Sequence, residues 1–146
     1  MIKKFIKKLF GKPEEISFGQ GFDLTGMPVI TLYQGEEKYN FLLDTGSNNS
    51  VINKKVLERM EYEPIEEENQ VIGSEGNPKM VDACMIRLSY KDKEFYYKYL
   101  INDLDKAFEH VKKTTGVTLH GLIGAKFFNA YKYVLDFDEL VAYSKL

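Results

Sequence analysis

An aspartate directly follows an apolar run in the first third of the chain, within the range Phe41–Ser47 (FLLDTGS). A carboxylate at the end of a buried segment is costly unless hydrogen bonds satisfy it. Thr45 and Ser47 supply hydroxyl groups for such bonds, and Gly46 lets the backbone approach closely. The run therefore predicts a short loop that holds the Asp44 carboxylate in a fixed position, where it could transfer protons.

Other groups that bind metals or attack substrates are few. The chain has two histidines, His110 and His120, and one cysteine, Cys84. This set offers no cluster with the spacing of metal ligands, so we expect no metal and no cofactor. His120 precedes a glycine and could act in catalysis, but its position favours packing or a local hydrogen bond. His110 is expected to be a solvated helix residue.

Three landmarks in a fixed order resemble those of the retropepsin-like aspartic proteases. Asp44–Ser47 looks like the active-site signature of this family. Gly73–Gly76, between two predicted strands, resembles the flap, a glycine-bearing hairpin that closes over substrate. His120–Gly124 resembles the paired hydrophobic–glycine element, which threads beneath the catalytic loop. A short helix and a strand follow as they do in the family, so the resemblance covers about residues 29–146.

The resemblance implies an aspartic endopeptidase that hydrolyses peptide bonds. In such enzymes two aspartates share one proton. The ionised member takes a proton from water, and the protonated member donates a hydrogen bond to the scissile carbonyl. This chain has one Asp-Thr/Ser-Gly sequence, because Asp136 and Asp138 are not followed by such residues. The family pattern then implies a homodimer whose twofold axis brings Asp44 to Asp44.

The resemblance also assigns roles to neighbouring residues. Thr45 would hydrogen-bond across the dimer, and Ser47 would bond the outer carboxylate oxygen. A peptide or protein substrate would lie extended beneath the flaps and pair with their strands. The site residues predicted in this way are Asp44 as the catalytic group, Thr45, Gly46 and Ser47 in its loop, Gly73, Ser74, Glu75 and Gly76 in the flap, and Leu122, Ile123 and Gly124 beneath the site.

Two departures from the family pattern leave an alternative open. Ala125 stands where retroviral members carry a charged or polar residue, which bears on the strength of the dimer and not on the fold. The segment 103–119 is longer than the corresponding segment of compact viral enzymes. We interpret it as a helical insertion and expect it to take over part of the dimer contact. The alternative is a catalytically silent module of the same fold that binds peptides or assembles another protein.

Short β-branched and aromatic segments alternate with turn signals along most of the chain. Hairpins are predicted with turns at residues 35–37 and 91–93, and strands over 133–137 and 140–143. The strand pattern begins at about Glu15. Together with the resemblance, it predicts a mainly β fold, a retropepsin-like closed β-barrel (acid protease fold) with a few short helices.

Helical spacing appears in only a few places. Asn53 to Met60 reads as a short helix with Asn53 as its cap. Residues 103–113 place Leu104, Ala107, Phe108 and Val111 on one face, and residues 125–130 read as a short helix near the C-terminus.

Residues 1–14 form a separate basic segment, in which apolar residues recur at helical spacing between lysines. We expect an amphipathic helix ahead of a domain that spans residues 15–146. Its apolar face either packs on the domain or on a partner, or makes weak contact with a membrane surface.

The composition narrows the classes of partner. Twenty basic and 22 acidic residues give a net charge of −2, which does not favour nucleic acid as a partner. With one cysteine no internal disulfide can form, which suits a reducing compartment. The start lacks the apolar stretch of a secretory signal. We therefore expect a cytoplasmic protein, membrane-peripheral if the basic helix binds lipid.

Overall fold

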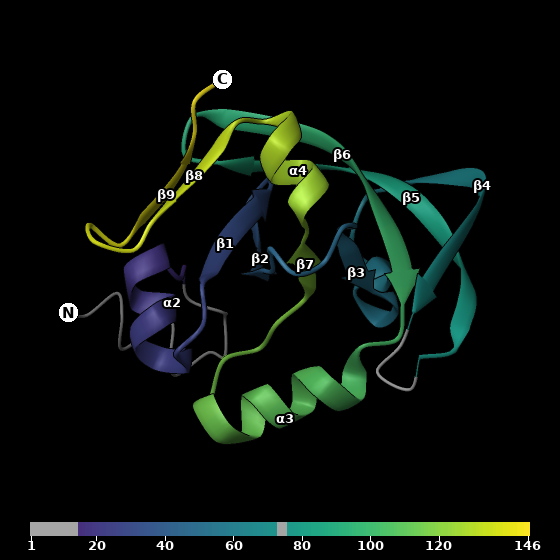
Figure 1. Cartoon of the computed structure of the whole chain (residues 1–146), viewed down its shortest axis with the longest axis horizontal. Coiled ribbons are helices and arrows are strands. Elements are labelled where there is room, and N and C mark those ends of the chain that lie inside the picture. Colours follow the sequence, from purple (N-terminus) through teal and green to yellow (C-terminus); the bar gives the residue numbers. More distant parts are fainter. Residues whose placement is uncertain (1–14, 73–75) are drawn as a thin grey trace.

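The computed structural model describes residues 15–72 and 76–146, and strands dominate it (Figure 1). Six strands close into a barrel in the order β1-β2-β7-β3-β6-β5, and a pairing of Tyr33 with Ser89 joins β5 back to β1. Their bounds are β1 (Val29–Gln34), β2 (Glu37–Leu43), β3 (Val51–Asn53), β5 (Pro78–Tyr90), β6 (Lys93–Asn102) and β7 (Gly121–Ile123). The prediction of a mainly β closed barrel is confirmed.

Both predicted hairpins are present. Strands β1 and β2 pair up to Gln34 and Glu37, so a two-residue turn joins them, and Gly35 adopts the positive φ of 60° that such turns need. Strands β5 and β6 pair up to Tyr90 and Lys93 around a second tight turn. The β-branched and aromatic runs therefore pair with their nearest neighbours in sequence, as expected.

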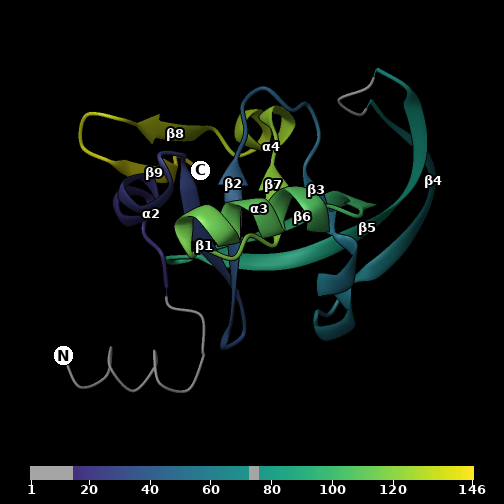
Figure 2. The ribbon, with the colours of Figure 1, turned by 90° about the horizontal axis from the view of Figure 1, so that it is seen from below.

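Strand β4 (Glu63–Ile72) pairs with β5 and extends the sheet beyond the barrel. Figures 1 and 2 show β4 and the first part of β5 curving away together as an arm. The register shifts between Ile65 and Asn69, which marks a β-bulge. A bulge bends a strand and increases its twist, and this one lies where the arm leaves the barrel wall.

The barrel encloses an apolar core to which most of its strands contribute. Burial of each large apolar side chain contributes about 1.5–3 kcal/mol. The largest fully buried side chains are Tyr39, Tyr99, Phe18, Phe41, Ile30, Leu32, Ile52, Ile86, Leu88, Leu100, Ile123 and Val29.

The strand pattern predicted from Glu15 is wrong for the first element, because α2 (Phe18–Thr25) is a helix. The Ser17 hydroxyl accepts a hydrogen bond from the Gln20 amide (3.2 Å), and Gly26 ends the helix with a φ of 70°. Phe18 is only 1% exposed, so tertiary packing stabilises this short helix.

The predicted helix 53–60 is a 3-10 helix, η1 (Lys54–Arg59), and Asn53 does not cap it through its side chain. Instead the Asn53 side chain accepts a hydrogen bond from the Leu104 amide and donates one to Asp105 (both 2.8 Å). It thereby anchors the start of α3 (Asp105–Thr115), which matches the predicted helix 103–113 within two residues. Both ends of the Asn53 amide are thus bonded at the start of α3, and neither bonds to η1.

Three of the four residues on the predicted apolar face of α3 pack against the barrel, whereas the fourth, Ala107, is exposed. Leu104, Phe108 and Val111 belong to a cluster with Val29 and Leu119. The helical insertion is therefore attached to its own subunit through this face.

The C-terminal part contains α4 (Ala125–Ala130), then β8 (Tyr133–Asp136) and β9 (Val141–Ser144), all close to their predicted bounds. Strands β8 and β9 form a separate antiparallel pair that lies beside α2 (Figures 1 and 2). None of the helices within the described part of the chain is long and apolar enough to span a membrane. The predicted basic helix at residues 1–14 lies outside the described residues, and the domain boundary after it stays a prediction.

Candidate active site

Asp44 is the first residue after β2, in the loop that leads to β3. Figure 2 shows this loop arching past α4 at one end of the barrel. The Asp44 amide donates to the carbonyl oxygen of Ile123 in β7 (2.8 Å). Strand β7 lies between β2 and β3, parallel to β2 and antiparallel to β3. The backbone of Asp44 is therefore fixed by a strand about 80 residues further along the sequence.

The loop folds back on the Asp44 carboxylate. The Gly46 amide donates to Asp44 Oδ1 (3.0 Å), and the Ser47 amide donates to the Asp44 carbonyl (3.2 Å). A Cβ at Gly46 would lie 3.3 Å from the same carboxylate oxygen, which is closer than ordinary contacts. The bond from the Gly46 amide restricts the rotation of the Asp44 carboxyl group.

The two hydroxyl residues of the loop are placed differently from each other. Thr45 is exposed on the surface. The Ser47 hydroxyl donates to the carbonyl of Asn49 (2.8 Å). In the single chain Ser47 therefore stabilises the turn of its own loop, whereas the family resemblance implies a bond to the outer carboxylate oxygen.

Leu122, Ile123 and Gly124 lie beneath this loop, where the sequence placed them. Leu122 pairs with Val51, and Ile123 pairs with Leu43, the residue before Asp44. The Gly124 amide donates to the hydroxyl of Ser50 (3.0 Å), which is buried. These contacts bring the two separate sequence motifs together.

The start of α4 holds the loop from its other side. The Ala125 amide donates to the Ser47 carbonyl (2.7 Å), and the Lys126 amide donates to the Asn48 carbonyl (3.1 Å). The Lys126 ammonium adds a contact to Asn49 Oδ1 (3.3 Å). Ala125, which departs from the family pattern, therefore contributes through its backbone to holding the loop.

The predicted flap, residues 73–76, falls between β4 and β5 in the sequence. Gly73, Ser74 and Glu75 fall outside the described residues. Gly76 is exposed and adopts a φ of 78°, two residues before β5 begins. Figure 2 shows the free end of the arm on the same side of the barrel as the loop that carries Asp44. The backbone thus places the arm where a hairpin could approach the site.

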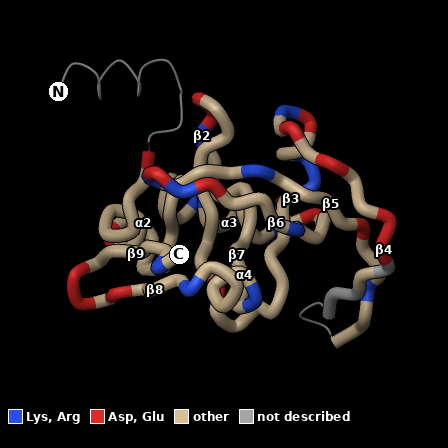
Figure 3. Tube along the Cα trace, turned by 90° about the horizontal axis from the view of Figure 1, so that it is seen from above, with Lys and Arg blue, Asp and Glu red and all other residues tan. Residues whose placement is uncertain are grey.

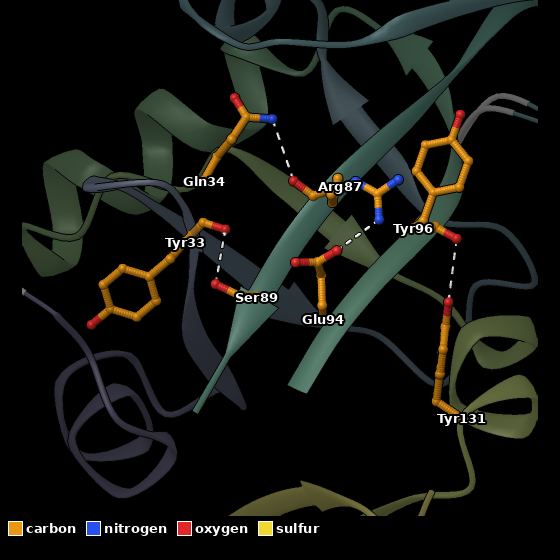
Figure 4. Close-up of polar contacts among 7 residues, drawn as sticks. All are labelled: Tyr33, Gln34, Arg87, Ser89, Glu94, Tyr96 and Tyr131. Atoms are coloured by element: carbon orange, nitrogen blue, oxygen red, sulfur yellow. Dashed lines mark hydrogen bonds and ion pairs between the residues drawn. The ribbon is translucent and has the colours of Figure 1, made fainter. Parts of the chain in front are cut away.

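Three cavities among the described residues lie away from Asp44. One of about 470 Å³ lies where the end of β1 meets β5 and β6 (Figure 4). There Arg87 pairs with Glu94 (2.7 Å) and stacks over the ring of Tyr96 at 4.6 Å. Two others measure about 440 and 610 Å³, and Asp44 lines none of the three. The partly exposed Asp44 therefore lies in none of these cavities.

The other acidic candidates have different surroundings. The Asp136 carboxylate accepts hydrogen bonds from the amides of Asp138 and Glu139 (both 2.9 Å). It therefore caps the turn between β8 and β9, where acidic residues gather in Figure 3. Asp136 is also the last residue of β8.

His120 is buried, and its Nδ1 accepts a hydrogen bond from the amide of Asn40 (2.8 Å). Burial lowers the pKa of His120 to about 4, and the charge of Arg59 acts in the same direction. Cys84 is also buried, and burial raises the pKa of its thiol to about 12. Among the described residues no group of three or more histidine, cysteine or acidic side chains could hold a metal ion.

Sequence reasoning missed Ser50 and Asn40. Each bonds to a residue at least 74 positions away, and neither lies in a motif that points to its partner. Their signal is indirect: both are polar residues next to apolar runs, where an unsatisfied side chain would be costly.

The comparisons with known proteins agree with this geometry. The sequence profile described as "Aspartyl protease" matches residues 29–127. The retroviral protease-like domain of Ddi1 from Leishmania major has a similar structure, with a TM-score of 0.55 and 12% identity, over 82% of this chain and 88% of that one. No match was found among curated protein sequences. The chain therefore belongs to the aspartyl protease family and has a retropepsin-like fold.

Proposed function

We propose that the protein is an aspartic endopeptidase that acts as a homodimer, with one Asp44 from each subunit. The observation that supports this most is the placement of Asp44. Its backbone is bonded to β7, its loop is bonded to α4, and its carboxylate lines none of the three cavities described above. A second copy related by a twofold axis would supply the other carboxylate and the opposite wall.

In the proposed dimer the two Asp44 carboxyl groups share one proton, since both cannot ionise easily at contact distance. The ionised member takes a proton from a water molecule as the water oxygen attacks the scissile carbonyl carbon. The protonated member donates a hydrogen bond to the carbonyl oxygen. The tetrahedral product of this attack breaks down when the amide nitrogen receives a proton and leaves, so that an acid and an amine are released.

The proposed substrate is an extended peptide segment. The free ends of the two β4–β5 arms would lie over it, and strand-like pairing of backbone groups would hold it. Gly76, with its positive φ, lets the chain turn at the end of the arm. The cytoplasmic location, and the contact of residues 1–14 with a partner or a membrane surface, stay predictions of the sequence.

A cleavage assay tests the proposal. A diverse peptide library is incubated at mildly acidic pH with the native protein, with Asp44→Asn and with the matched control Asp138→Asn. The control makes the same substitution at an exposed aspartate in the β8–β9 turn. We expect cleavage by the native protein and the control, and a loss of at least about a hundredfold in Asp44→Asn.

Two other outcomes count against the proposal. Equal cleavage by all three proteins would show that Asp44 takes no part. No cleavage by a folded, dimeric native protein would favour the silent peptide-binding or assembly module, which Ala125 and the Ser47–Asn49 bond leave open.

A further inference from the structure

A set of buried hydrogen bonds links β1 and β2 to the segment that precedes β7. The Thr31 hydroxyl donates to Asn40 Oδ1 (2.7 Å), and Asn40 Nδ2 donates to the Thr118 carbonyl (2.9 Å). The Asn40 amide donates to Nδ1 of His120 (2.8 Å). Thr31, Asn40 and His120 are all at most 3% exposed. Loss of one partner in such a buried network leaves a donor or acceptor without water to replace it.

His120 is held on both sides through its backbone as well. Its amide donates to the Asn40 carbonyl (2.8 Å), and its carbonyl accepts from the Asn53 amide (2.9 Å). The ring adds a third contact, which requires Nδ1 to carry a free lone pair. A protonated imidazole has a hydrogen on both nitrogens and cannot accept the Asn40 bond.

This contact lies close to the site along a rigid path. His120 is the residue immediately before β7, and Ile123 at the end of β7 accepts the amide of Asp44 (2.8 Å). Between them, Gly121 packs so closely on its neighbours that a Cβ there would lie 2.6 Å from the Phe41 ring and 2.7 Å from the Val51 carbonyl oxygen. A displacement of His120 would therefore reach Asp44 through three residues of strand.

We propose that His120 is a positioning residue for Asp44: its neutral ring fixes the start of β7, and its protonation releases that strand and sets the acid limit of activity. The first half concerns the fold alone, and the second half rests on the proposed proteolysis.

Burial and the nearby cations favour the neutral form of the ring, and together they outweigh the Asn40 backbone, which raises the pKa of His120. The ring of Tyr39, from β2, lies edge-on at a centroid distance of 5.4 Å. Burial is the largest cause of the lowered pKa, and the cations Arg59 and Lys55, both on η1, act in the same direction. The His120 ring is therefore protonated only at acid pH. This is the range in which a proton-sharing pair of aspartates works.

Hydrogen exchange tests the positioning role without any need for activity. The amide of Asp44 is followed by NMR in the native protein, in His120→Leu and in His120→Asn, whose side-chain oxygen can replace Nδ1 as acceptor. We expect protection of the Asp44 amide to fall more than tenfold in His120→Leu and to recover in His120→Asn, while the amide of Leu88 in the β5–β6 pair stays protected. Unchanged protection of Asp44 in a folded His120→Leu overturns the proposal.

The pH profile of kcat/KM tests the acid limit, and it serves alone if His120→Leu does not fold. His120→Asn keeps an acceptor that does not titrate, so its acid limb should move to lower pH than that of the native protein. The matched control is His110→Asn, at the exposed histidine of α3, which should leave the limb in place. An acid limb that is the same in His120→Asn and in the native protein overturns the proposal. If no variant cleaves peptides, the proposed function fails while the exchange result still decides the positioning role.

Discussion

Gly124 and Asn49 approach so closely that a Cβ on Gly124 would lie 2.5 Å from the Asn49 carbonyl oxygen. The same Cβ would lie 2.8 Å from the carbonyl oxygen of Ser47. The glycine at the end of β7 is therefore required by the loop that carries Asp44, and not by its own backbone angles, which are extended (φ −99°). Two motifs that lie 80 residues apart in the sequence fit together at this contact.

Gly124→Ala should displace the Asp44 loop. Because both nearby atoms belong to backbone, neither can rotate away, and we expect a loss of about 1–3 kcal/mol in the free energy of unfolding. Any cleavage activity should fall further than stability explains, since the loop itself moves. Urea unfolding and the cleavage assay measure the two effects. The control is Gly19→Ala, where the new Cβ would lie 3.4 Å from the Leu140 side chain. Equal stability of both variants would contradict the prediction.

Tyr133→Phe should leave stability unchanged or raise it slightly. The Tyr133 hydroxyl oxygen is buried and is the one such side-chain atom in the described part of the chain without a hydrogen-bond partner. Removing an unsatisfied buried hydroxyl removes its desolvation cost, about 1–3 kcal/mol at most. Tyr131→Phe is the matched control, because the Tyr131 hydroxyl donates a hydrogen bond to the Tyr96 carbonyl (3.3 Å, Figure 4). Loss of this bond should lower the stability of the variant. Thermal unfolding measures the Tm of both variants. A clear decrease in the Tm of Tyr133→Phe would show that the Tyr133 hydroxyl has a hydrogen-bond partner, against the prediction.

The hairpins could be predicted from the sequence because their signals are local, whereas the prediction of a closed barrel also needed the resemblance to the family. Runs such as 29–34 and 37–43 combine β-branched and aromatic residues with a glycine turn between them. Helix α2 could not, because Gly19 and Gly21 lower its helix propensity. Packing explains one of these glycines: a Cβ at Gly21 would lie 2.4 Å from the Val29 carbonyl oxygen.

The candidate site likewise has parts that the local sequence predicts and parts that it does not. The loop at Asp44 and the element at Gly124 are short motifs that can be read directly. The groups that hold them, Ser50, Asn40 and the Asn53 side chain, bond to residues 51 to 80 positions away. Only the barrel closure brings such partners together, so no local pattern identifies them. Asn53 stands at the predicted N-cap position of η1, but its side chain bonds to the start of α3, a contact that the local sequence does not reveal.

His120 should make the free energy of unfolding depend on pH. Its pKa is about 4 in the folded protein, against 6.5 for an unperturbed histidine. The unfolded chain therefore binds the proton more readily. The stabilisation is fully present above about pH 6.5 and is lost as pH falls toward 4, by about 3 kcal/mol in all. Urea unfolding at pH 7 and pH 5 measures the change.

Arg59→Gln should reduce this dependence on pH. Removing the Arg59 charge lets the pKa of His120 rise toward its ordinary value, so the difference between pH 7 and pH 5 becomes smaller. Arg87→Gln makes the same substitution at the other arginine of the chain, which pairs with Glu94 instead. It should leave the pH dependence as in the native protein. If the free energy of unfolding changes equally between pH 7 and pH 5 in both variants, Arg59 does not act on His120.

Mixing experiments should reveal whether two Asp44 residues form one site. If subunits exchange freely, an equal amount of Asp44→Asn added to the native protein places about half of the native chains in mixed dimers. Since a mixed dimer has one ionisable Asp44 where the proposed pair needs two, activity per native chain should fall to about half. A ninefold excess of the variant should lower it to about one tenth.

The control for this mixture is Asp138→Asn, which keeps Asp44 and should cause no loss at any ratio. Dilution gives an independent check, because the activity of a dissociating dimer falls faster than protein concentration. Activity per native chain that stays constant in the presence of excess Asp44→Asn would mean that each subunit works alone. In that case a second proton-transfer group would have to be sought within the single chain, and Asp44 would lose its proposed partner.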